Sequence, residues 1–341
     1  MRRGKAADKT PLDGIDLLLA DLDGVVYKGK AAIPHAVDAI NQAAERMRVG
    51  YVTNNASRLP ASVAEQLAGF GLTVTADDVV TSSQAAAVVL STLVPAESTV
   101  LVVGGEGLRT ALADAGFRVT DSAQDAPRAV AQGFDPTVGW AQLAEASFAL
   151  HSDDPAAGIP WVATNTDWTL PVERGLAPGN GTLVSAVHSA VGRLPVVAGK
   201  PETPIFELAR DRFGADSALM IGDRLDTDIK GANAAGIATA LILTGVDRAK
   251  QVLAADAKSR PTYLLDDLRG LHEPYPDVVT SGTADDRTVT VGKSVVRMTG
   301  LAVRVVRKGK RPIDLLRAGA AAIWASGRSI YALDVDPDLF F

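Results

Sequence analysis

Short apolar runs alternate with helix-like segments along most of the chain. The runs are residues 15–20, 48–52, 219–221 and 240–243. Runs this short and this apolar are typical of strands buried in a parallel sheet. A polar turn follows each of them, and the first is followed by a helical pattern through Ala36, Ile40 and Ala43. Repeated strand–helix units predict an α/β fold with a doubly wound, Rossmann-like parallel sheet, whose sites lie beyond the carboxyl ends of the strands.

A second set of strand–helix units lies between residues 83 and 196. Its expected strands are residues 99–103, 118–119, 129–132 and 161–164. The segment is long enough to be a domain, and it interrupts the first series of strands. We therefore expect an inserted α/β cap domain over residues 83–196, and a catalytic core made of residues 12–82 and 197–272.

A glycine-rich run, Gly104-Gly105-Glu106-Gly107, follows the first expected strand of the cap. Such runs suggest a dinucleotide-binding turn, but the glycine spacing is wrong and no acidic residue follows at the required distance. We interpret the run as a plain strand-to-helix turn.

The pattern changes after His272. Residues 273–286 are rich in Pro, Asp, Gly, Thr and Ser, which is typical of a linker. Strand-like alternation, a helical segment and a last strand follow. The expected elements are strands at 288–291, 294–298, 301–306 and 330–335, and a helix at 313–325. We predict a small C-terminal α+β module over residues 287–341.

Composition narrows the class of protein. The 341 residues are 47% hydrophobic and include no cysteine, which excludes disulfides, thiolate zinc sites and cysteine nucleophiles. A net charge of −6 argues against a nucleic-acid partner. No run approaches the ~18 apolar residues that a membrane span needs. We expect a cytoplasmic protein with a small-molecule substrate and no membrane partner, and a homodimer is left open.

Asp21 and Asp23 stand where the first apolar run ends. Residues two apart on a strand point to the same face, so the two carboxylates are neighbours. They repel each other unless a cation sits between them or one binds a proton. A magnesium ion would meet the first need, and the second carboxylate would then be available for acid–base work. A solvated loop is the alternative interpretation of an Asp-x-Asp sequence.

Two further strand ends carry groups that suit a phosphate. Thr53 offers a hydroxyl, and the backbone N–H groups around Asn54 can cradle an anion. Lys200 lies between Gly199 and Pro201. It is either an ordinary surface lysine or a positive charge held against phosphate oxygens.

A third strand end, Gly222-Asp223, opens a turn with two more carboxylates, Asp226 and Asp228. Helix capping accounts for Asp226. It does not account for Asp223, which stands where the apolar strand ends. Asp223 is therefore a candidate metal ligand.

Taken in order, these strand ends resemble the four motifs of the haloacid dehalogenase superfamily. The motifs are Asp21-Leu22-Asp23-Gly24-Val25, Val52-Thr53-Asn54-Asn55, Gly199-Lys200-Pro201, and Gly222-Asp223 with Asp228. The large insert between the second and third motifs resembles the subgroup of 4-nitrophenyl, phosphoglycolate and nucleotide phosphatases. With its C-terminal module, the whole chain looks most like the actinobacterial glycerol-3-phosphate phosphatases.

The resemblance implies a role for each carboxylate. Asp21 is the nucleophile that forms an aspartyl-phosphate, and Asp23 is the acid and base. Mg²⁺ is held by Asp21, the backbone carbonyl of Asp23 and Asp223. Asp228 orders the groups around the metal.

The resemblance also implies where the phosphate binds. Lys200 acts as a catalytic cation on the transferring group, and the Thr53-Asn54-Asn55 segment binds its oxygens. The core motifs recognise only phosphate and metal, so the cap must distinguish the leaving groups. We expect this from the loop between Asn165 and Gly181. Its candidate specificity residues are Asn165, Asp167, Trp168 and Arg174, although Trp168 has the alternative of packing inside the cap.

The expected reaction is therefore Mg²⁺-dependent hydrolysis of a small phosphomonoester, with glycerol 3-phosphate giving glycerol and phosphate. Phosphoglycolate or a nucleoside monophosphate is the alternative substrate. A dehalogenase is disfavoured by Asp23, because carbon–halogen cleavage needs no acid for an alkoxide. A non-catalytic regulatory protein that binds a phosphate ligand is the alternative of another class.

Overall fold

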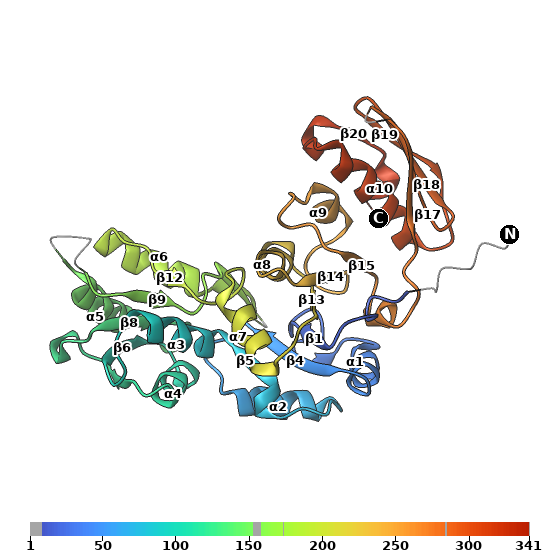
Figure 1. Cartoon of the computed structure of the whole chain (residues 1–341). Coiled ribbons are helices and arrows are strands. Elements are labelled where there is room, and N and C mark those ends of the chain that lie inside the picture. The colour runs from blue at the N-terminus through green and yellow to red at the C-terminus, as the bar shows by residue number, and fades with distance from the viewer. Residues whose placement is uncertain (1–8, 153–157, 173, 284, 341) are drawn as a thin grey trace. The chain divides into compact units, whose positions relative to one another are not determined.

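The computed structural model describes residues 9–152, 158–172, 174–283 and 285–340. It divides into two compact units (Figure 1). Unit 1 holds the described residues up to Arg48 and those from Ser217 onward, and unit 2 is the continuous segment Val49–Asp216. The predicted cap, residues 83–196, lies within unit 2.

Unit 1 is built on parallel strands in the order β15-β14-β13-β1. These are β1 (Leu17–Ala20), β13 (Ala218–Gly222), β14 (Ala238–Ile242) and β15 (Tyr263–Leu265). Every residue of β1 and β13 is buried, as their unbroken apolar sequences predicted. The register pairs Leu17 with Ala218 and Ala20 with Ile221, so both strands end at the same edge.

Short helices connect these strands. They are α1 (Ala36–Ala44), α8 (Lys230–Ala234) and α9 (Ala249–Ala254), with a π-helical turn at Leu225–Ile229 and a small antiparallel pair, β2 (Tyr27–Lys28) and β3 (Ala31–Ala32). The alternation of parallel strands and helices confirms the predicted α/β class.

The C-terminal residues of unit 1 form a second, mostly antiparallel sheet in the order β16-β17-β18-β19-β20. The strands are β16 (Val278–Gly282), β17 (Asp286–Val291), β18 (Ser294–Thr299), β19 (Ala302–Arg307) and β20 (Asp334–Val335), and α10 (Pro312–Ser326) lies against the sheet (Figure 1). Two expectations were wrong in detail. β16 occupies the predicted linker, and the predicted strand 330–335 is a 3₁₀ turn at Ile330–Ala332 followed by only two strand residues.

Helix α10 is buried on nearly every side. It packs between the C-terminal sheet and the edge of the parallel sheet at β15, together with α9. Its residues Ile313, Leu316 and Ile323 share one apolar core with Leu253 and Leu264. The C-terminal residues therefore pack as part of unit 1.

Unit 2 begins with a parallel pair, β4 (Arg48–Thr53) and β5 (Val79–Thr81). Helices α2 (Pro60–Gly69), α3 (Ser82–Leu93) and α7 (Pro204–Phe213) accompany it. Thr81 caps α3 by accepting a hydrogen bond from the Gln84 N–H, and the Gln84 side chain accepts one from the Thr81 N–H.

The cap sheet of unit 2 is parallel, in the order β12-β9-β8-β6-β7. Its strands are β6 (Thr99–Val103), β7 (Arg118–Thr120), β8 (Ala129–Gln132), β9 (Trp161–Ala163) and β12 (Val196–Val197), and its helices are α4 (Glu106–Asp114), α5 (Trp140–Leu150) and α6 (Asn180–Val191). The four predicted cap strands are confirmed within one or two residues.

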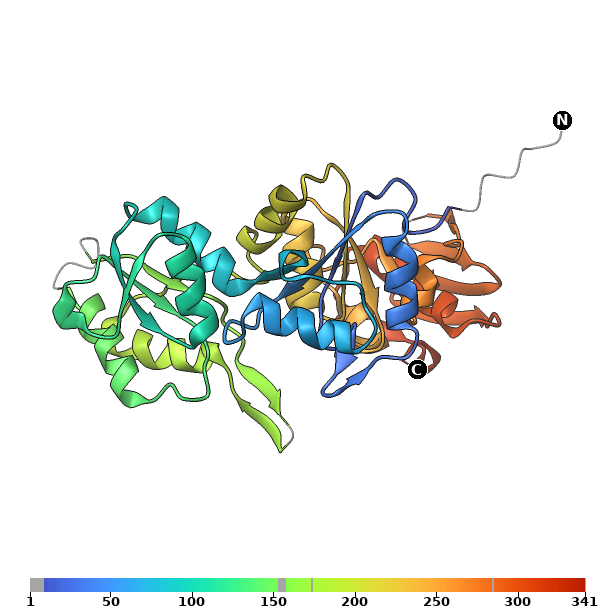
Figure 2. The same cartoon turned by 90° about the horizontal axis from the view of Figure 1, so that it is seen from below.

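One element of the cap was not predicted. The segment between Asn165 and Gly181 was expected to be a loop, but it contains a hairpin of β10 (Thr169–Val172) and β11 (Gly175–Pro178). Figure 2 shows this hairpin as a ribbon that extends out of the cap. Its sequence lacks a regular apolar alternation, because most of its side chains are exposed on both faces.

Within the described residues, none of the helices has the length and apolar character required to cross a lipid bilayer.

Candidate active site

The predicted site residues fall into two groups, one in each unit. In unit 1, Asp21 follows β1 directly, and its N–H donates a hydrogen bond of 2.9 Å to the Ile221 carbonyl. This bond continues the β1–β13 pairing by one residue. Asp21 is 9% exposed, whereas Asp223 and Asp228 are 1% exposed.

Three carboxylates meet at this sheet edge. One oxygen each from Asp21, Asp223 and Asp228 lies within 4.8 Å of the others, the one such acidic set among the described residues. Three buried carboxylates this close repel one another unless a cation lies between them or one of them binds a proton. Hard oxygen ligands of this kind suit Mg²⁺, so the residues present fit the predicted metal.

Close packing of the backbone shapes this site. Gly24 has φ +84°, and a Cβ at Gly24 or at Gly245 would overlap the Asp223 carboxylate. Both glycines therefore allow the chain to pass directly beside that side chain. The Val246 N–H donates to Asp223 Oδ2 at 2.6 Å, which fixes the orientation of the carboxylate.

Asp228 reaches the site because the chain after β13 makes a π-helical turn. The Arg224 N–H donates to Asp228 Oδ2 at 3.2 Å. In the same turn, Asp226 points outward and pairs with Arg224 at 2.8 Å. Burial tends to raise the pKa of Asp226, but the hydrogen bond and charge of Arg224 outweigh it and lower that pKa.

Asp247 was missed by the sequence analysis. Its carboxylate accepts a 2.6 Å hydrogen bond from the Leu225 N–H, and its own N–H donates to the Asp223 carbonyl. Burial raises the pKa of Asp247. The signal available was its place just beyond the carboxyl end of β14, the same position that singled out the other carboxylates.

Asp23 lies in the turn after Asp21 and is exposed. Its carboxylate does not belong to the set of three formed by the described residues. This agrees with the expectation that Asp23 contributes a backbone carbonyl to the metal and keeps its side chain for proton transfer, which stays a prediction.

In unit 2, the second and third motifs are joined by the side chain of Asn54. Asn54 Oδ1 accepts from the Lys200 N–H at 2.8 Å, and Asn54 Nδ2 donates to the Lys200 carbonyl at 3.0 Å. Lys200 is 3% exposed, and its Nζ donates to the Val52 carbonyl at 3.3 Å. Lys200 is thus a buried cation beside the end of β4, and the surface-lysine interpretation is wrong.

Thr53 and Asn55, on either side of Asn54 in the predicted phosphate segment, differ in burial. The Thr53 hydroxyl, 6% exposed, accepts from the Asn55 N–H at 3.1 Å. The Asn55 side chain is exposed and accepts from the N–H and hydroxyl of Ser57 at 3.0 Å each. Asn55 therefore closes a turn with its side chain, and its role in phosphate binding stays a prediction.

The cap loop after β9 also forms hydrogen bonds with Asn54. Asn54 Nδ2 donates to Asp167 Oδ2 at 3.2 Å, and the Asn54 carbonyl accepts from Asn165 Nδ2 at 2.8 Å. Asn165 is 4% exposed and receives a bond from the Asp167 N–H at 3.1 Å. Two of the predicted specificity residues are therefore fixed against the second motif.

The other two predicted specificity residues lie elsewhere. Trp168 is 67% exposed, so it does not pack inside the cap. Arg174 is exposed at the end of the hairpin. Among the described residues, the hydrogen bonds of Asn54 involve neither of them.

The chain is similar to known hydrolases over most of its length. Residues 18–118 match the model of a haloacid dehalogenase-like hydrolase family, and residues 197–271 match a second model of such hydrolases. The D-glycerol 3-phosphate phosphatase of Mycobacterium tuberculosis is 43% identical over 323 residues, covering 88% of this chain and 90% of that protein. A 5′-nucleotidase of Bacillus subtilis is 35% identical, covering 73% of this chain and 94% of that protein.

A solved structure of glycerol phosphate phosphatase from Mycobacterium tuberculosis, in complex with magnesium, has a TM-score of 0.81 and 39% identity to this chain. It covers 96% of this chain and 94% of its own. The likeness therefore includes the C-terminal sheet and α10 as well as the two motif-bearing regions.

Proposed function

Because the chain belongs to the haloacid dehalogenase-like hydrolases, we propose that it is a magnesium-dependent phosphatase in which Asp21 accepts the phosphoryl group. The observation that carries this proposal is the approach of Asp21, Asp223 and Asp228 to within 4.8 Å at one strand edge. Asp21 and Asp223, with the backbone carbonyl of Asp23, would hold Mg²⁺, and Asp228 would order them. Bound Mg²⁺ supplies charge that polarises the phosphoryl group.

The remaining residues have separate tasks. Asp21 attacks phosphorus and forms an aspartyl-phosphate as the alkoxide leaves. Asp23 gives its proton to that alkoxide and then removes a proton from the water that hydrolyses the intermediate. Lys200, held by Asn54, provides positive charge to the transferring group, and the Thr53 hydroxyl and neighbouring N–H groups bind its oxygens.

For the substrate we propose glycerol 3-phosphate. A relative matched over 88% of this chain is a D-glycerol 3-phosphate phosphatase. Asp167, fixed beside Asn54, offers a carboxylate suited to the hydroxyls of glycerol, and Asn165 holds Asp167 and Asn54 in place. A site built to bind a hydroxyl rejects analogues that lack it, by factors up to ~10⁴.

The test is kcat/KM with Mg²⁺ for glycerol 3-phosphate, phosphoglycolate and a nucleoside monophosphate. The 5′-nucleotidase relative makes the nucleotide the relevant competitor. We expect glycerol 3-phosphate to give the highest value, and a preference for the nucleotide would overturn the substrate proposal.

Asp21→Asn serves as the inactive control, and unchanged turnover by that variant, after mass spectrometry has excluded deamidation, would overturn the mechanism. Absence of turnover with every phosphate ester, 4-nitrophenyl phosphate included, would favour the regulatory alternative.

A cytoplasmic location and a homodimeric state stay predictions. Cell fractionation tests the first, and light scattering of the purified protein tests the second.

A further inference from the structure

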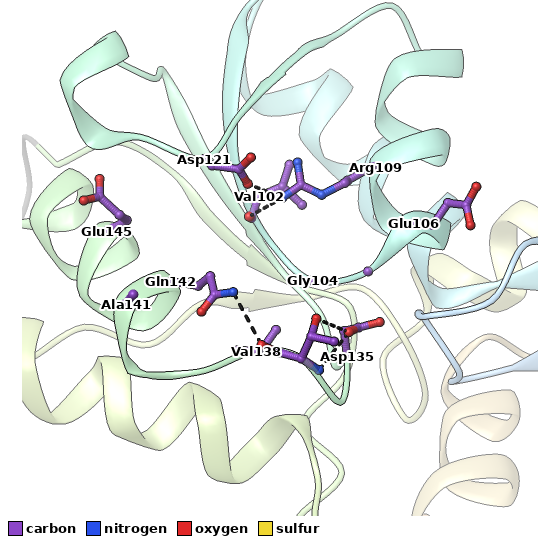
Figure 3. Close-up of a pocket in the computed structure, with 12 residues that line it drawn as sticks. Val102, Gly104, Glu106, Arg109, Asp121, Asp135, Val138, Ala141, Gln142 and Glu145 are labelled. Carbon is purple, nitrogen blue, oxygen red and sulfur yellow. Dashed lines mark hydrogen bonds and ion pairs between the residues drawn. The ribbon is translucent and has the colours of Figure 1, made fainter.

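The cap contains a cavity that the proposed catalysis does not use. It has a volume of about 700 Å³ and opens at the carboxyl end of the cap sheet (Figure 3). Its walls come from the turn between β6 and α4, from α4 itself, from the loop between β8 and α5, and from α5. Its lining includes none of the candidate active-site residues, and its volume is in the range of small-molecule sites.

The cavity coincides with the switch point of the cap sheet. In the order β12-β9-β8-β6-β7, the chain leaves β6 for β7 on one side and then crosses to β8 on the other. The connections that leave the carboxyl ends of β6 and β8 run to β7 and to β9, in opposite directions across the sheet, and ligands of open parallel sheets bind outside such points. The topology therefore favours a ligand at this place.

The glycine-rich turn shapes one wall. A Cβ on Gly105 would overlap the carboxylate of Asp135, which belongs to the opposite loop. Gly104 lies at φ +158°, and a Cβ there would come within 3.1 Å of the Leu108 side chain. The run interpreted from the sequence as a plain turn thus brings two loops together at the mouth of the cavity.

Carboxylates outnumber cations in the lining. The acidic residues are Glu106, Asp121, Asp135 and Glu145, and the basic residue is Arg109. The Arg109 guanidinium pairs with Asp121 and donates to the Val102 carbonyl at 3.5 Å (Figure 3). The positive charge in the lining is therefore already balanced, whereas three carboxylates remain.

Two of these carboxylates each use one oxygen in the fold. Asp135 Oδ1 accepts from the N–H and hydroxyl of Thr137, at 2.9 and 2.6 Å. Glu145 Oε2 accepts from the Ala123 N–H at 2.6 Å. Each of these two side chains is thus held in place through one of its two carboxylate oxygens.

The chemistry of the lining selects the class of ligand. An anion would find the N-termini of α4 and α5, but Glu106 stands in the first turn of α4 and Gln142 already accepts from the Gly139 N–H that begins α5. A single metal ion is also disfavoured, because among the described residues only Asp21, Asp223 and Asp228 converge closely enough. We propose that the cavity binds a small organic cation bearing amino groups, which reaches separate carboxylates.

The test is titration calorimetry on the whole protein at saturating Mg²⁺, so that the acidic set near Asp21 is occupied. The probes are putrescine, the diol of the same chain length, and succinate, which share a four-carbon backbone and differ in charge. We expect putrescine to bind with one-to-one stoichiometry, and the diol and succinate to give no binding. Binding of succinate instead, or no binding of putrescine, would overturn the proposal.

Isosteric variants locate the site. Asp135→Asn together with Glu145→Gln keeps both accepting oxygens and removes only charge, so it should fold and weaken putrescine binding about tenfold. Glu106→Gln, an exposed position, should weaken it to a smaller extent. Asp114→Asn removes the same charge from the exposed end of α4 outside the cavity and should leave binding unchanged. Equal affinity in the double variant and the unmodified protein would show that putrescine binds elsewhere.

Discussion

At the residue scale, the surroundings of individual carboxylates differ at the carboxyl ends of β1 and β13, where the metal is expected to bind. The Asp223 carboxylate is buried, accepts the Val246 N–H, and lies against two glycines that leave it room. Asp226, three residues further along, has the same side chain but pairs with Arg224 at the surface. These two carboxylates of one turn therefore have different surroundings, and we expect only Asp223 to bind the metal.

Asp223→Asn should therefore lower the affinity for Mg²⁺ by at least about tenfold, because a buried anionic ligand becomes a neutral amide. Asp226→Asn should leave that affinity within about twofold, since its charge is screened by solvent and by Arg224. The measurement is the rise in melting temperature with Mg²⁺ concentration, which needs no turnover. Equal losses in the two variants would contradict the assignment of Asp223.

Asn54 is the second decisive residue, because its side chain bonds the backbone of Lys200 on both sides and also bonds Asp167. Asn54→Ala leaves these partly buried groups without their partner, and should lower the free energy of unfolding by about 1–3 kcal/mol. Asn55→Ala, which loses only exposed bonds to Ser57, should cost less than about 1 kcal/mol. Denaturant unfolding measures both, and a smaller loss for Asn54→Ala than for Asn55→Ala would contradict this role.

At the scale of elements, the β10–β11 hairpin combines a fixed base with exposed strands. The Gly179 N–H donates to the Trp168 carbonyl at 2.8 Å, and the Gly181 N–H to the Asp167 carbonyl at 2.9 Å. Beyond this base, Leu176 is 76% exposed. We therefore expect the hydrogen-bonded base beside Asn54, rather than the exposed strands, to distinguish leaving groups.

Asp167→Ala should accordingly erode the preference for glycerol 3-phosphate over a nucleoside monophosphate. We expect kcat/KM for glycerol 3-phosphate to fall by about 10-fold or more, because a carboxylate–hydroxyl hydrogen bond is lost. Turnover of 4-nitrophenyl phosphate, which has no such hydroxyl, is the internal control and should fall much less. If every substrate slows alike, the loop does not distinguish leaving groups.

At the scale of the whole molecule, the C-terminal sheet and α10 are built into unit 1. Arg317 of α10 is 5% exposed and donates to the Leu264 carbonyl of β15 at 3.0 and 2.6 Å. It also pairs with Asp314 at 2.8 Å and lies 4.3 Å from the ring centre of Tyr275. The same core includes Leu225 and Ile229 of the turn that carries Asp228.

Unit 1 should therefore unfold with its C-terminal sheet in one transition. Arg317→Met strands the Asp314 charge in the core and should lower the free energy of unfolding by about 3–5 kcal/mol. Arg328→Met, which removes an exposed pair with Asp285, should cost less than about 1 kcal/mol. Equilibrium unfolding followed by circular dichroism compares them. An early separate transition in Arg317→Met, with the main transition unmoved, would mean that the C-terminal region folds independently.

The sequence by itself determined the buried parallel strands and the residues at their ends. Buried parallel strands must be apolar throughout, so the positions of Asp21, Thr53 and Asp223 at strand ends were visible in the local pattern. The order of the four motifs along the chain was enough to identify the haloacid dehalogenase family. These features depend on neighbours in the chain, which a sequence displays directly.

Only the tertiary structure decided which of these groups meet. Asp228 joins Asp21 and Asp223 while the Asp23 side chain does not, because strand register and a π-helical turn set their positions. The hairpin after Asn165 and the burial of α10 were likewise hidden, since exposed strands need no apolar alternation and a shared core is made by segments distant in the chain. Contacts of this kind arise from pairing between remote elements, and no local pattern encodes them.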